Sequence, residues 1–377
     1  MSYLIVGCGL SGATVAERIS TILNEKVVII DKRDHIAGNC YDYIDDETGI
    51  LINKYGAHLF HTNNEEVWQY ISKFSEWVRW EHKVLSYIDN KYVSVPVNIT
   101  TVNEICGTNI SDSNEMKKWL DDNQIKFKEK IKNSEEMALS RVGKNLYEKM
   151  FLPYTIKQWN KHPTELDESV LARIPVRYDF DTRYFSDKYQ YLPKNGYTEL
   201  VKKMINNSNI ELILNMDYNN YKLKYDISKF KGIIFTGAID SYFENVNLPK
   251  LEYRSIDFKI ERLPISGFFQ PNSVVNYPCL DVDFTRIIEY KDFLNQKSNN
   301  TLIVKEFPSD EGEPYYPVPN KINLELYEQY RKIAKNDENT KKVYFLGRLA
   351  NYKYYNMDET IYNSLKFFKE TLYCLCN

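Results

Sequence analysis

The sequence Tyr3-Leu-Ile-Val-Gly7-Cys-Gly9-Leu-Ser-Gly12 joins a short apolar run to a turn that carries three glycines. The next residues, 13–19, place their apolar side chains at helical spacing, and a second apolar run at 27–30 ends in Asp31. Strand, glycine turn, helix, strand and acid make a βαβ unit. The acid stands 31 − 12 = 19 residues past the third glycine, where a ribose-binding carboxylate belongs. This stretch predicts a dinucleotide-binding fold.

Elements that could complete this fold return much later in the chain. Short apolar runs stand at 210–214, 232–237 and 343–346, and a helical pattern follows at 358–373. The second of these runs ends in glycine, as a strand of the dinucleotide fold would. We therefore expect the fold to be assembled from the beginning, the middle and the end of the chain.

The residues between these elements predict other structure. Residues 113–150 are rich in charge and predict a helical insertion. A further helix is predicted over 320–336. Residues 160–185 include Pro163 and Pro175, have weak periodicity and predict a long loop. Four β-rich runs predict an antiparallel sheet: 251–260, 273–277, 285–290 and 301–307.

The composition is that of a globular protein with balanced charge. The 377 residues include 49 basic and 52 acidic ones, so the net charge of −3 offers no field to hold a nucleic-acid backbone. No apolar run reaches the roughly 18 residues that a membrane helix needs. The six cysteines show no disulfide framework, which predicts thiols in a reducing compartment. We expect a cytoplasmic protein with no nucleic-acid partner and no membrane insertion.

Several short motifs follow the βαβ unit. They are Asp31-Lys-Arg33-Asp-His35-Ile-Ala-Gly38-Asn39, Tyr55-Gly-Ala-His58-Leu-Phe-His61-Thr62, Pro153-Tyr-Thr155-Ile-Lys-Gln-Trp159, Ala172-Arg173-Ile-Pro-Val-Arg177, Tyr184-Phe-Ser-Asp187, Thr285-Arg286-Ile-Ile-Glu289, Glu313-Pro-Tyr-Tyr316-Pro and Gly347-Arg348-Leu-Ala-Asn-Tyr352-Lys-Tyr354-Tyr355. With this ordered set the chain resembles the bacterial UDP-galactopyranose mutase family over essentially its whole length.

The resemblance implies an α/β fold with three parts. These are a discontinuous Rossmann-like FAD-binding domain, an inserted small helical domain and a twisted antiparallel β-sheet domain. The FAD-binding domain would comprise 1–80, 196–245 and 335–377. The helical domain would comprise 100–172, with a mobile substrate loop at 160–185. The sheet domain would comprise 81–99, 184–195 and 246–334.

The resemblance also implies a reaction. Family members interconvert UDP-galactopyranose and UDP-galactofuranose, which supplies cell-surface polysaccharide. FAD, reduced by NADPH or NADH, attacks the anomeric carbon through N5 and displaces UDP, and the sugar recloses through a flavin-iminium intermediate without net redox. We expect UDP-galactose and UDP-galactofuranose as ligands, and a homodimer.

Eleven residues are predicted to bind the cofactor. The three glycines let the backbone approach a pyrophosphate at a helix N-terminus. Asp31 stands where the family usually has the longer Glu, and Ala37 replaces a glycine, so a positive φ there would be less comfortable. The set is Gly7, Gly9, Ser11, Gly12, Asp31, Lys32, Asn39, His58, Leu59, Arg348 and Met357.

A second set is predicted to bind the substrate. Phe151 and Tyr154 would sandwich the uracil, although aromatic residues at this density also pack cores. Arg173, on the mobile loop, and Arg286, on a strand, carry guanidinium forks that match diphosphate oxygens and stabilise the charge on departing UDP. The substrate set is His82, Phe151, Tyr154, Thr155, Trp159, Arg173, Tyr184, Asn276, Arg286, Tyr316 and Tyr354. The predicted catalytic residues are Arg173, Arg286, His61 and Tyr354.

Other interpretations stay open. The substrate could be UDP-N-acetylgalactosamine, although the rigid imidazole of His61 favours UDP-galactose. A flavin amine-oxidase-like oxidoreductase would share the βαβ unit. Tyr362 and Lys366 match the Tyr-x-x-x-Lys pair of NAD-dependent epimerases but stand very late in the chain. A non-catalytic UDP-binding protein is the remaining alternative. No third ligand accompanies His58 and His61 at matching spacing, so no metal site is predicted.

Overall fold

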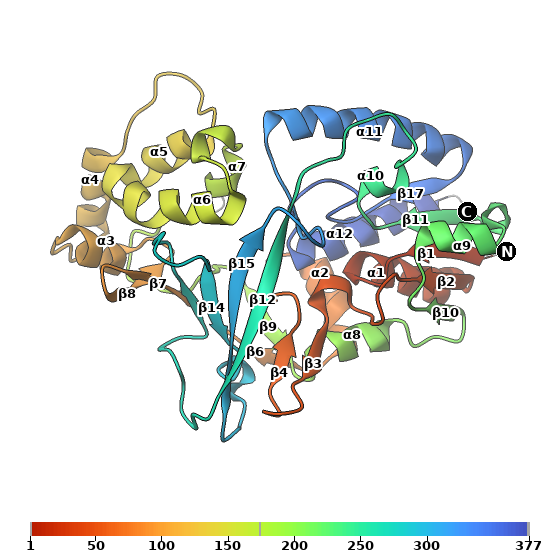
Figure 1. The fold of residues 1–377 in the computed structure, drawn as a ribbon, viewed down its shortest axis with the longest axis horizontal. Coiled ribbons are helices and arrows are strands. Elements are labelled where there is room, and N and C mark those ends of the chain that lie inside the picture. Colours follow the sequence, from red (N-terminus) through yellow and green to blue (C-terminus); the bar gives the residue numbers. More distant parts are fainter. Residues whose placement is uncertain (1, 173–174, 375–377) are drawn as a thin grey trace.

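A computed structural model describes residues 2–172 and 175–374 (Figure 1). Its first component is a five-stranded parallel sheet in the order β10-β2-β1-β11-β17. The strands are β1 (Ser2–Val6), β2 (Lys26–Ile30), β10 (Ile210–Ile213), β11 (Gly232–Phe235) and β17 (Val343–Phe345). The prediction that the middle and end of the chain rejoin the first βαβ unit is confirmed.

Helices cover both faces of this sheet because successive residues of a strand point in opposite directions. On β1, Tyr3 and Ile5 pack into one buried cluster and Leu4 into another. The first cluster includes α1 (Leu10–Arg18), α2 (Glu65–Ile71), α8 (Gly196–Met204) and α12 (Met357–Phe367). The second includes α9 (Tyr218–Lys224), α10 (Ile239–Tyr242) and α11 (Lys321–Thr340). This is the Rossmann-like arrangement that the glycine turn predicts.

The second component is a seven-stranded sheet in the order β16-β12-β15-β14-β13-β7-β8. Neighbouring strands are antiparallel, except that β13 runs parallel to β7. The strands are β7 (Val84–Ile88), β8 (Lys91–Val95), β12 (Tyr253–Leu263), β13 (Val274–Asn276), β14 (Arg286–Glu289), β15 (Thr301–Ser309) and β16 (Tyr316–Pro317). The four β-rich runs thus form strands of one sheet, as predicted.

A group of helices packs against one end of this sheet, away from the parallel sheet (Figure 1). They are α3 (Ile99–Cys106), α4 (Ser113–Asn123), α5 (Ser134–Leu146), α6 (Leu152–Trp159) and α7 (Ser169–Ala172). The helical region predicted over 113–150 is interrupted at 124–133, where Ile125 and Phe127 are exposed. A new helix begins after Asn133, whose side chain accepts a hydrogen bond from the amide of Glu136 at 2.9 Å.

Two smaller sheets connect these components. The hairpin β3 (Asp42–Ile44) and β4 (Leu51–Asn53) forms one, and β5 (Phe60–Thr62), β9 (Tyr189–Pro193) and β6 (Trp77–Arg79) form the other. The segment 184–195 was expected with the large antiparallel sheet, whereas β9 pairs with β5 and β6. Aromatic stacking accounts for this placement, because Trp68 stacks on both Tyr189 and Tyr191, with ring centroids 4.8 and 4.7 Å apart.

The predicted loop at 160–185 contains the short helix α7 and is attached after it. The amide of Arg177 donates to the carbonyl of Val97 at 2.9 Å, and the amide of Tyr184 donates to the carbonyl of His82 at 2.7 Å. Arg173 lies outside the described residues, so its predicted roles stay predictions. Among the helices of 2–172 and 175–374, none combines the length and apolarity needed to cross a bilayer.

Candidate functional site

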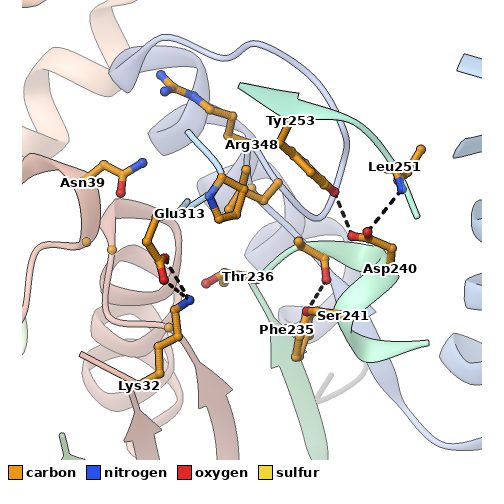
Figure 2. Close-up of a pocket in the computed structure, with 18 of the residues that line it drawn as sticks. Lys32, Asn39, Phe235, Thr236, Asp240, Ser241, Leu251, Tyr253, Glu313 and Arg348 are labelled. Atoms are coloured by element: carbon orange, nitrogen blue, oxygen red, sulfur yellow. Dashed lines mark hydrogen bonds and ion pairs between the residues drawn. The ribbon is translucent and has the colours of Figure 1, made fainter. Parts of the chain in front are cut away.

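A cavity of 990 Å³ opens at the carboxyl ends of the parallel strands (Figure 2). Its lining includes nine of the eleven predicted cofactor-binding residues: Gly7, Gly9, Ser11, Asp31, Lys32, Asn39, His58, Arg348 and Met357. The two others lie just behind the wall. Gly12 is buried beneath the turn, and Leu59 is half-buried against the core of the antiparallel sheet. One cavity thus collects residues from the beginning and the end of the chain.

The glycine turn lets three backbone segments meet at this cavity. Gly7 has φ +105°, and a Cβ there would lie 2.1 Å from Oγ1 of Thr236, at the end of β11. A Cβ on Gly12 would lie 2.0 Å from the carbonyl oxygen of Gly7, and one on Gly38 would lie 2.9 Å from Cα of Gly9. These approaches require glycine and leave a cradle whose wall is backbone.

The N-terminus of α1 points its amide groups into this cradle. Gly9 occupies the N-cap position without a side-chain cap, so those amides are available to an anion. The Asp31 carboxylate accepts from the amides of Cys8 at 2.7 Å and Arg33 at 2.9 Å. Asp31 therefore braces the turn, and each of its oxygens keeps a lone pair for a ribose hydroxyl.

The opposite wall carries positive charge. Arg348 donates to the carbonyl of Tyr355 at 2.6 Å, and its guanidinium lies over the rings of Tyr354 and Tyr316, at 5.0 and 5.6 Å from their centroids. At the rim, Lys32 pairs with Glu313 at 2.8 Å, as Figure 2 shows. This pair joins the parallel-sheet component to the segment that enters β16.

His58 contributes a neutral ring to the cavity. Its Nδ1 lies 2.8 Å from the carbonyl of Gly56, which fixes the tautomer with the proton on Nδ1. Burial, with the nearby charge of Arg348, lowers the pKa of His58 to about 4. Nε2 is therefore a hydrogen-bond acceptor at neutral pH. The expected discomfort at Ala37 is present, since this alanine has φ +70°.

Arg286 is held between two elements at the predicted diphosphate position. Its guanidinium donates to the hydroxyl of Tyr154, on α6, at 2.5 Å and pairs with the buried carboxylate of Glu306, on β15, at 3.2 Å. Burial alone would lower the pKa of Arg286, but Tyr154 and Glu306 hold it well above its ordinary value. The side chain keeps 34% of its surface exposed, so the fork is charged, oriented and accessible.

Asn276 lies beside Arg286 across the β13–β14 pair, where the two residues are direct partners in register. The Oδ1 atom of Asn276 is buried and has no hydrogen-bond partner within the described structure. A buried acceptor without a partner is costly unless a ligand supplies the donor. This atom therefore favours the predicted polar contact with the substrate.

Tyr316 and Tyr354 form a stacked pair beside Arg348. Their rings stack with centroids 5.2 Å apart and an interplanar angle of 12°. Burial raises the pKa of Tyr316 further than any other influence, and the charges of Arg348 and Arg286 both act to lower it. The charges of Arg348 and Arg286 therefore both act on Tyr316, and Arg348 lies over both stacked rings.

His61 and His82 both pack against the ring of Phe185. His61 stacks on Phe185 with centroids 3.6 Å apart and contacts Asp187 through Nδ1 at 2.9 Å. His82 packs edge-on against Tyr184, at 5.9 Å between centroids. Burial lowers the pKa of His82 to about 3, with further lowering from the charges of Arg286 and then His61. His82 is therefore uncharged at neutral pH, and the charge of Arg286 acts on it.

The remaining predicted substrate residues lie on α6 and the turn before it. Phe151 and Trp159 are buried in the core cluster of the antiparallel sheet, and Trp159 also lines the cavity. Thr155, which lies between these two residues in the sequence, is also buried. These aromatics therefore pack a core, as the alternative interpretation held, while Tyr154 on the same helix reaches Arg286.

Sequence reasoning missed three residues of this site. Glu306 interrupts the apolar β15 run with a buried charge, which is the signal that should have predicted a cationic partner. Asp187 and Phe185 stand in the Tyr184-Phe-Ser-Asp187 motif, but that motif alone does not predict them as site residues. Their role depends on β9 pairing with β5, which places them beside His61.

One alternative interpretation fails on geometry. Tyr362 and Lys366 lie on the exposed face of α12, so the epimerase-like pair is wrong. Among the residues that the structure describes, no group of three or more His, Cys, Asp or Glu side chains could hold a metal ion.

Comparison with known proteins identifies the family. The family model for UDP-galactopyranose mutase matches residues 149–354, and a model for NAD(P)-binding Rossmann-like domains matches 5–74. The chain is 34% identical to a Klebsiella pneumoniae protein named "Probable UDP-galactopyranose mutase", over 100% of this chain and 96% of that one. It is 36% identical to a dTDP-fucopyranose mutase of Escherichia coli, over 96% of each chain.

The fold agrees with this grouping. A crystal structure of reduced UDP-galactopyranose mutase superimposes with a TM-score of 0.77 at 15% identity, covering 99% of this chain and 96% of that one. This chain carries both the glycine-lined cavity and the Arg286 cluster within this fold. The chain therefore belongs to the UDP-galactopyranose mutase family of isomerases.

Proposed function

We propose that the protein interconverts UDP-galactopyranose and UDP-galactofuranose with FAD as its cofactor. The observation that carries this proposal is the position of Arg286, a charged fork held by Tyr154 and Glu306 beside the unpartnered acceptor of Asn276. Arg286 would hold the diphosphate of the substrate, and Arg348 would hold the flavin end of the cofactor.

The residues present fit FAD. A Cβ on Gly7, Gly12 or Gly38 would collide with its neighbours, and the uncapped amides of α1 suit a pyrophosphate. Asp31 would hold the ribose, while Asn39, Arg348 and Met357 would hold the flavin end of the cofactor. Reduced FAD, when bound, supplies a nucleophilic nitrogen that can take the place of UDP on the anomeric carbon.

The chain's own side chains would stabilise the negative charge that develops on the β-phosphate and would orient the substrate. As the anomeric bond breaks, negative charge grows on the β-phosphate, and the permanently charged Arg286 stabilises it. Asn276 and Tyr154 would keep the departed UDP in place while the ring opens and recloses. Arg173 would supply a second fork from the mobile loop. His61 and the neutral His82 would form the wall beside the sugar.

A direct experiment tests this function. The purified protein is denatured and the released cofactor is chromatographed, with FAD expected. UDP-galactofuranose is then incubated with the native protein with and without dithionite, and UDP-galactopyranose is measured by chromatography. Turnover should need reduced protein but consume no reductant. Release of NAD alone, or turnover stoichiometric with NADPH, would contradict the proposal.

A second candidate substrate comes from the Escherichia coli relative, since this chain is as similar to that dTDP-fucopyranose mutase as to the Klebsiella protein. The two substrates share a nucleoside diphosphate and a galactose-configured ring. They differ in the 6-hydroxyl, the ribose 2′-hydroxyl and the 5-methyl of the base. Comparing kcat/KM for the two furanose substrates decides between them.

A further inference from the structure

Lys157 makes an unusual set of contacts beside the candidate substrate site. It lies on α6, and its ammonium donates to four backbone carbonyls: Tyr277 at 2.5 Å, Cys279 at 2.7 Å, Phe284 at 2.9 Å and Val282 at 3.0 Å. All four carbonyls belong to the connection between β13 and β14. The Lys157 side chain thus holds together the backbone of the loop that joins β13 to β14.

That loop begins and ends at predicted substrate residues. Asn276 is the last residue of β13, Arg286 is the first of β14, and the two are partners in register. The amide of Tyr277 donates to the carbonyl of Thr285 at 2.8 Å and closes the loop directly beyond this pair. Any change in the loop is therefore transmitted to the placement of Asn276 and Arg286.

Lys157 and Tyr154 are three residues apart and lie one helical turn from each other on α6. Tyr154 contacts the Arg286 guanidinium, while Lys157 contacts the loop that carries Arg286. The helix is therefore attached to the same hairpin at two points. One point lies at the functional group, and the other fixes the backbone behind it.

The electrostatics show that the contact is made with a charge. An ammonium has three donors, so four carbonyl partners are held by the cation's attraction for their dipoles as well as by hydrogen bonds. Burial lowers the pKa of Lys157 to about 8, and the nearby Cys279, Asp283 and Asp281 act to raise it. An apolar side chain of the same length could fill the space but could not order these carbonyls.

We propose that Lys157 is a positioning residue for substrate binding, which clamps the 277–284 loop to α6 and thereby sets the Arg286 fork and Asn276 against the nucleotide side of the site. This inference rests on the proposed function, because it assumes that Arg286 receives the diphosphate. It assigns no chemistry to Lys157. The residue acts through Arg286 and Asn276.

The test measures the dissociation constant of UDP by calorimetry on the flavin-loaded protein. K157M should bind UDP about 10- to 100-fold more weakly than the wild type, the scale expected when hydrogen bonds to a charged group are lost. Flavin content and the melting temperature report whether the fold persists. K149M is the matched control, because Lys149 precedes α6 and pairs with the exposed Asp89 at 2.6 Å. It should bind UDP as the wild type does.

A double-mutant cycle separates positioning from general destabilisation. R286K keeps the charge of Arg286 but removes the fork that Lys157 is proposed to aim. If Lys157 acts through that fork, K157M should cost much less affinity in the R286K background than in the wild type. Equal costs in both backgrounds would overturn the proposal, as would UDP affinity of K157M within threefold of the wild type.

Two further measurements keep the outcome decisive. K157Q, which keeps donors without charge, enters the same cycle if K157M does not fold. Because burial lowers the pKa of Lys157 to about 8, the loss of UDP affinity between pH 7 and pH 9 should be larger in the wild type than in K157M; a larger loss in K157M would contradict a charged clamp. A wild type that does not bind UDP at all would instead overturn the proposed function.

Discussion

Gly12 and Gly9 lie three residues apart in the same turn but are required for different reasons. A Cβ on Gly12 would collide with the carbonyl of Gly7 at 2.0 Å, whereas a Cβ on Gly9 would meet only Cα of Gly38, at an ordinary 3.7 Å. Gly12 is therefore needed by the fold itself. Gly9 lines the cavity, and its side is left open for the ligand.

This difference predicts separable effects. G12A should destabilise the protein even without cofactor by about 1–3 kcal/mol, the usual cost of overpacking, as measured by urea unfolding of the apoprotein. G9A should leave apoprotein stability within about 0.5 kcal/mol of the wild type, as surface-type changes do, but should lower flavin occupancy. If both variants lost the same free energy of unfolding, Gly9 would be required by the fold just as Gly12 is. The turn would then have no side that is reserved for a ligand.

His82 predicts a pH effect. Its pKa of about 3 lies below the ordinary value of 6.5, so the unfolded chain binds the proton more readily than the folded one. The stabilisation is therefore complete above pH 6.5 and is lost as pH falls toward the folded pKa. Between pH 6.5 and pH 4 this amounts to about 3 kcal/mol at 1.36 kcal/mol per pH unit.

H82N removes the titrating ring, so its urea-unfolding free energy should fall less over that pH range than that of the wild type. The carboxylates and His58 contribute equally to the pH dependence of unfolding in both proteins, so their contributions cancel when the two curves are compared. H162N, at an exposed histidine, is the control and should follow the wild-type curve. Parallel curves for H82N and the wild type would contradict the assignment of a neutral buried ring.

At the scale of elements, Arg286 and Glu306 are direct partners across β14 and β15. The Glu306 side chain is 4% exposed and burial raises its pKa, against the lowering effect of Arg286. A buried carboxylate of this kind is tolerated because its partner is a cation. The pair therefore supports the sheet as well as orienting the fork.

Breaking this pair on one side should be more harmful than replacing both sides. R286M leaves Glu306 buried without a cation and should cost about 2–4 kcal/mol, toward the lower end for buried pairs because Arg286 is partly exposed. R286M/E306Q should recover about 1 kcal/mol or more of that loss, which a urea-unfolding cycle measures. Additive losses would show that the two side chains do not interact energetically.

How far the sequence predicts these elements depends on how local their causes are. The βαβ unit and the strand of Arg286 follow from glycine spacing and β-rich runs, which act over a few residues. The break before Asn133 depends on a single capping side chain within a helical pattern. The pairing of β9 with β5 depends on contacts between residues far apart in the chain, which no local pattern contains.

At the scale of the whole molecule, the candidate site exists only because distant segments converge. Glycines near residue 10 and Arg348 line one cavity, α6 and the β13–β15 strands meet at Arg286, and β5 meets the segment before β9 at His61. Motifs in the sequence therefore name candidate residues, but they do not predict how these residues are arranged in space. The Lys32–Glu313 pair, the Arg286–Tyr154 bond and the Lys157 contacts are among those that join these segments.

This convergence predicts which sugar is accepted. His61 is fixed between the ring of Phe185 and the carboxylate of Asp187, and His82 is 3% exposed behind it. A wall held in this way cannot swing aside, so an N-acetyl group at the sugar C2 should be excluded. We expect kcat/KM for UDP-galactofuranose to exceed that for its N-acetylgalactosamine counterpart by about 10- to 200-fold, the usual discrimination against added bulk. The measurement uses dithionite-reduced protein and both furanose substrates. D187A, which frees the His61 ring on one side, should narrow the difference, and near-equal values for the wild type would show that the wall does not face C2.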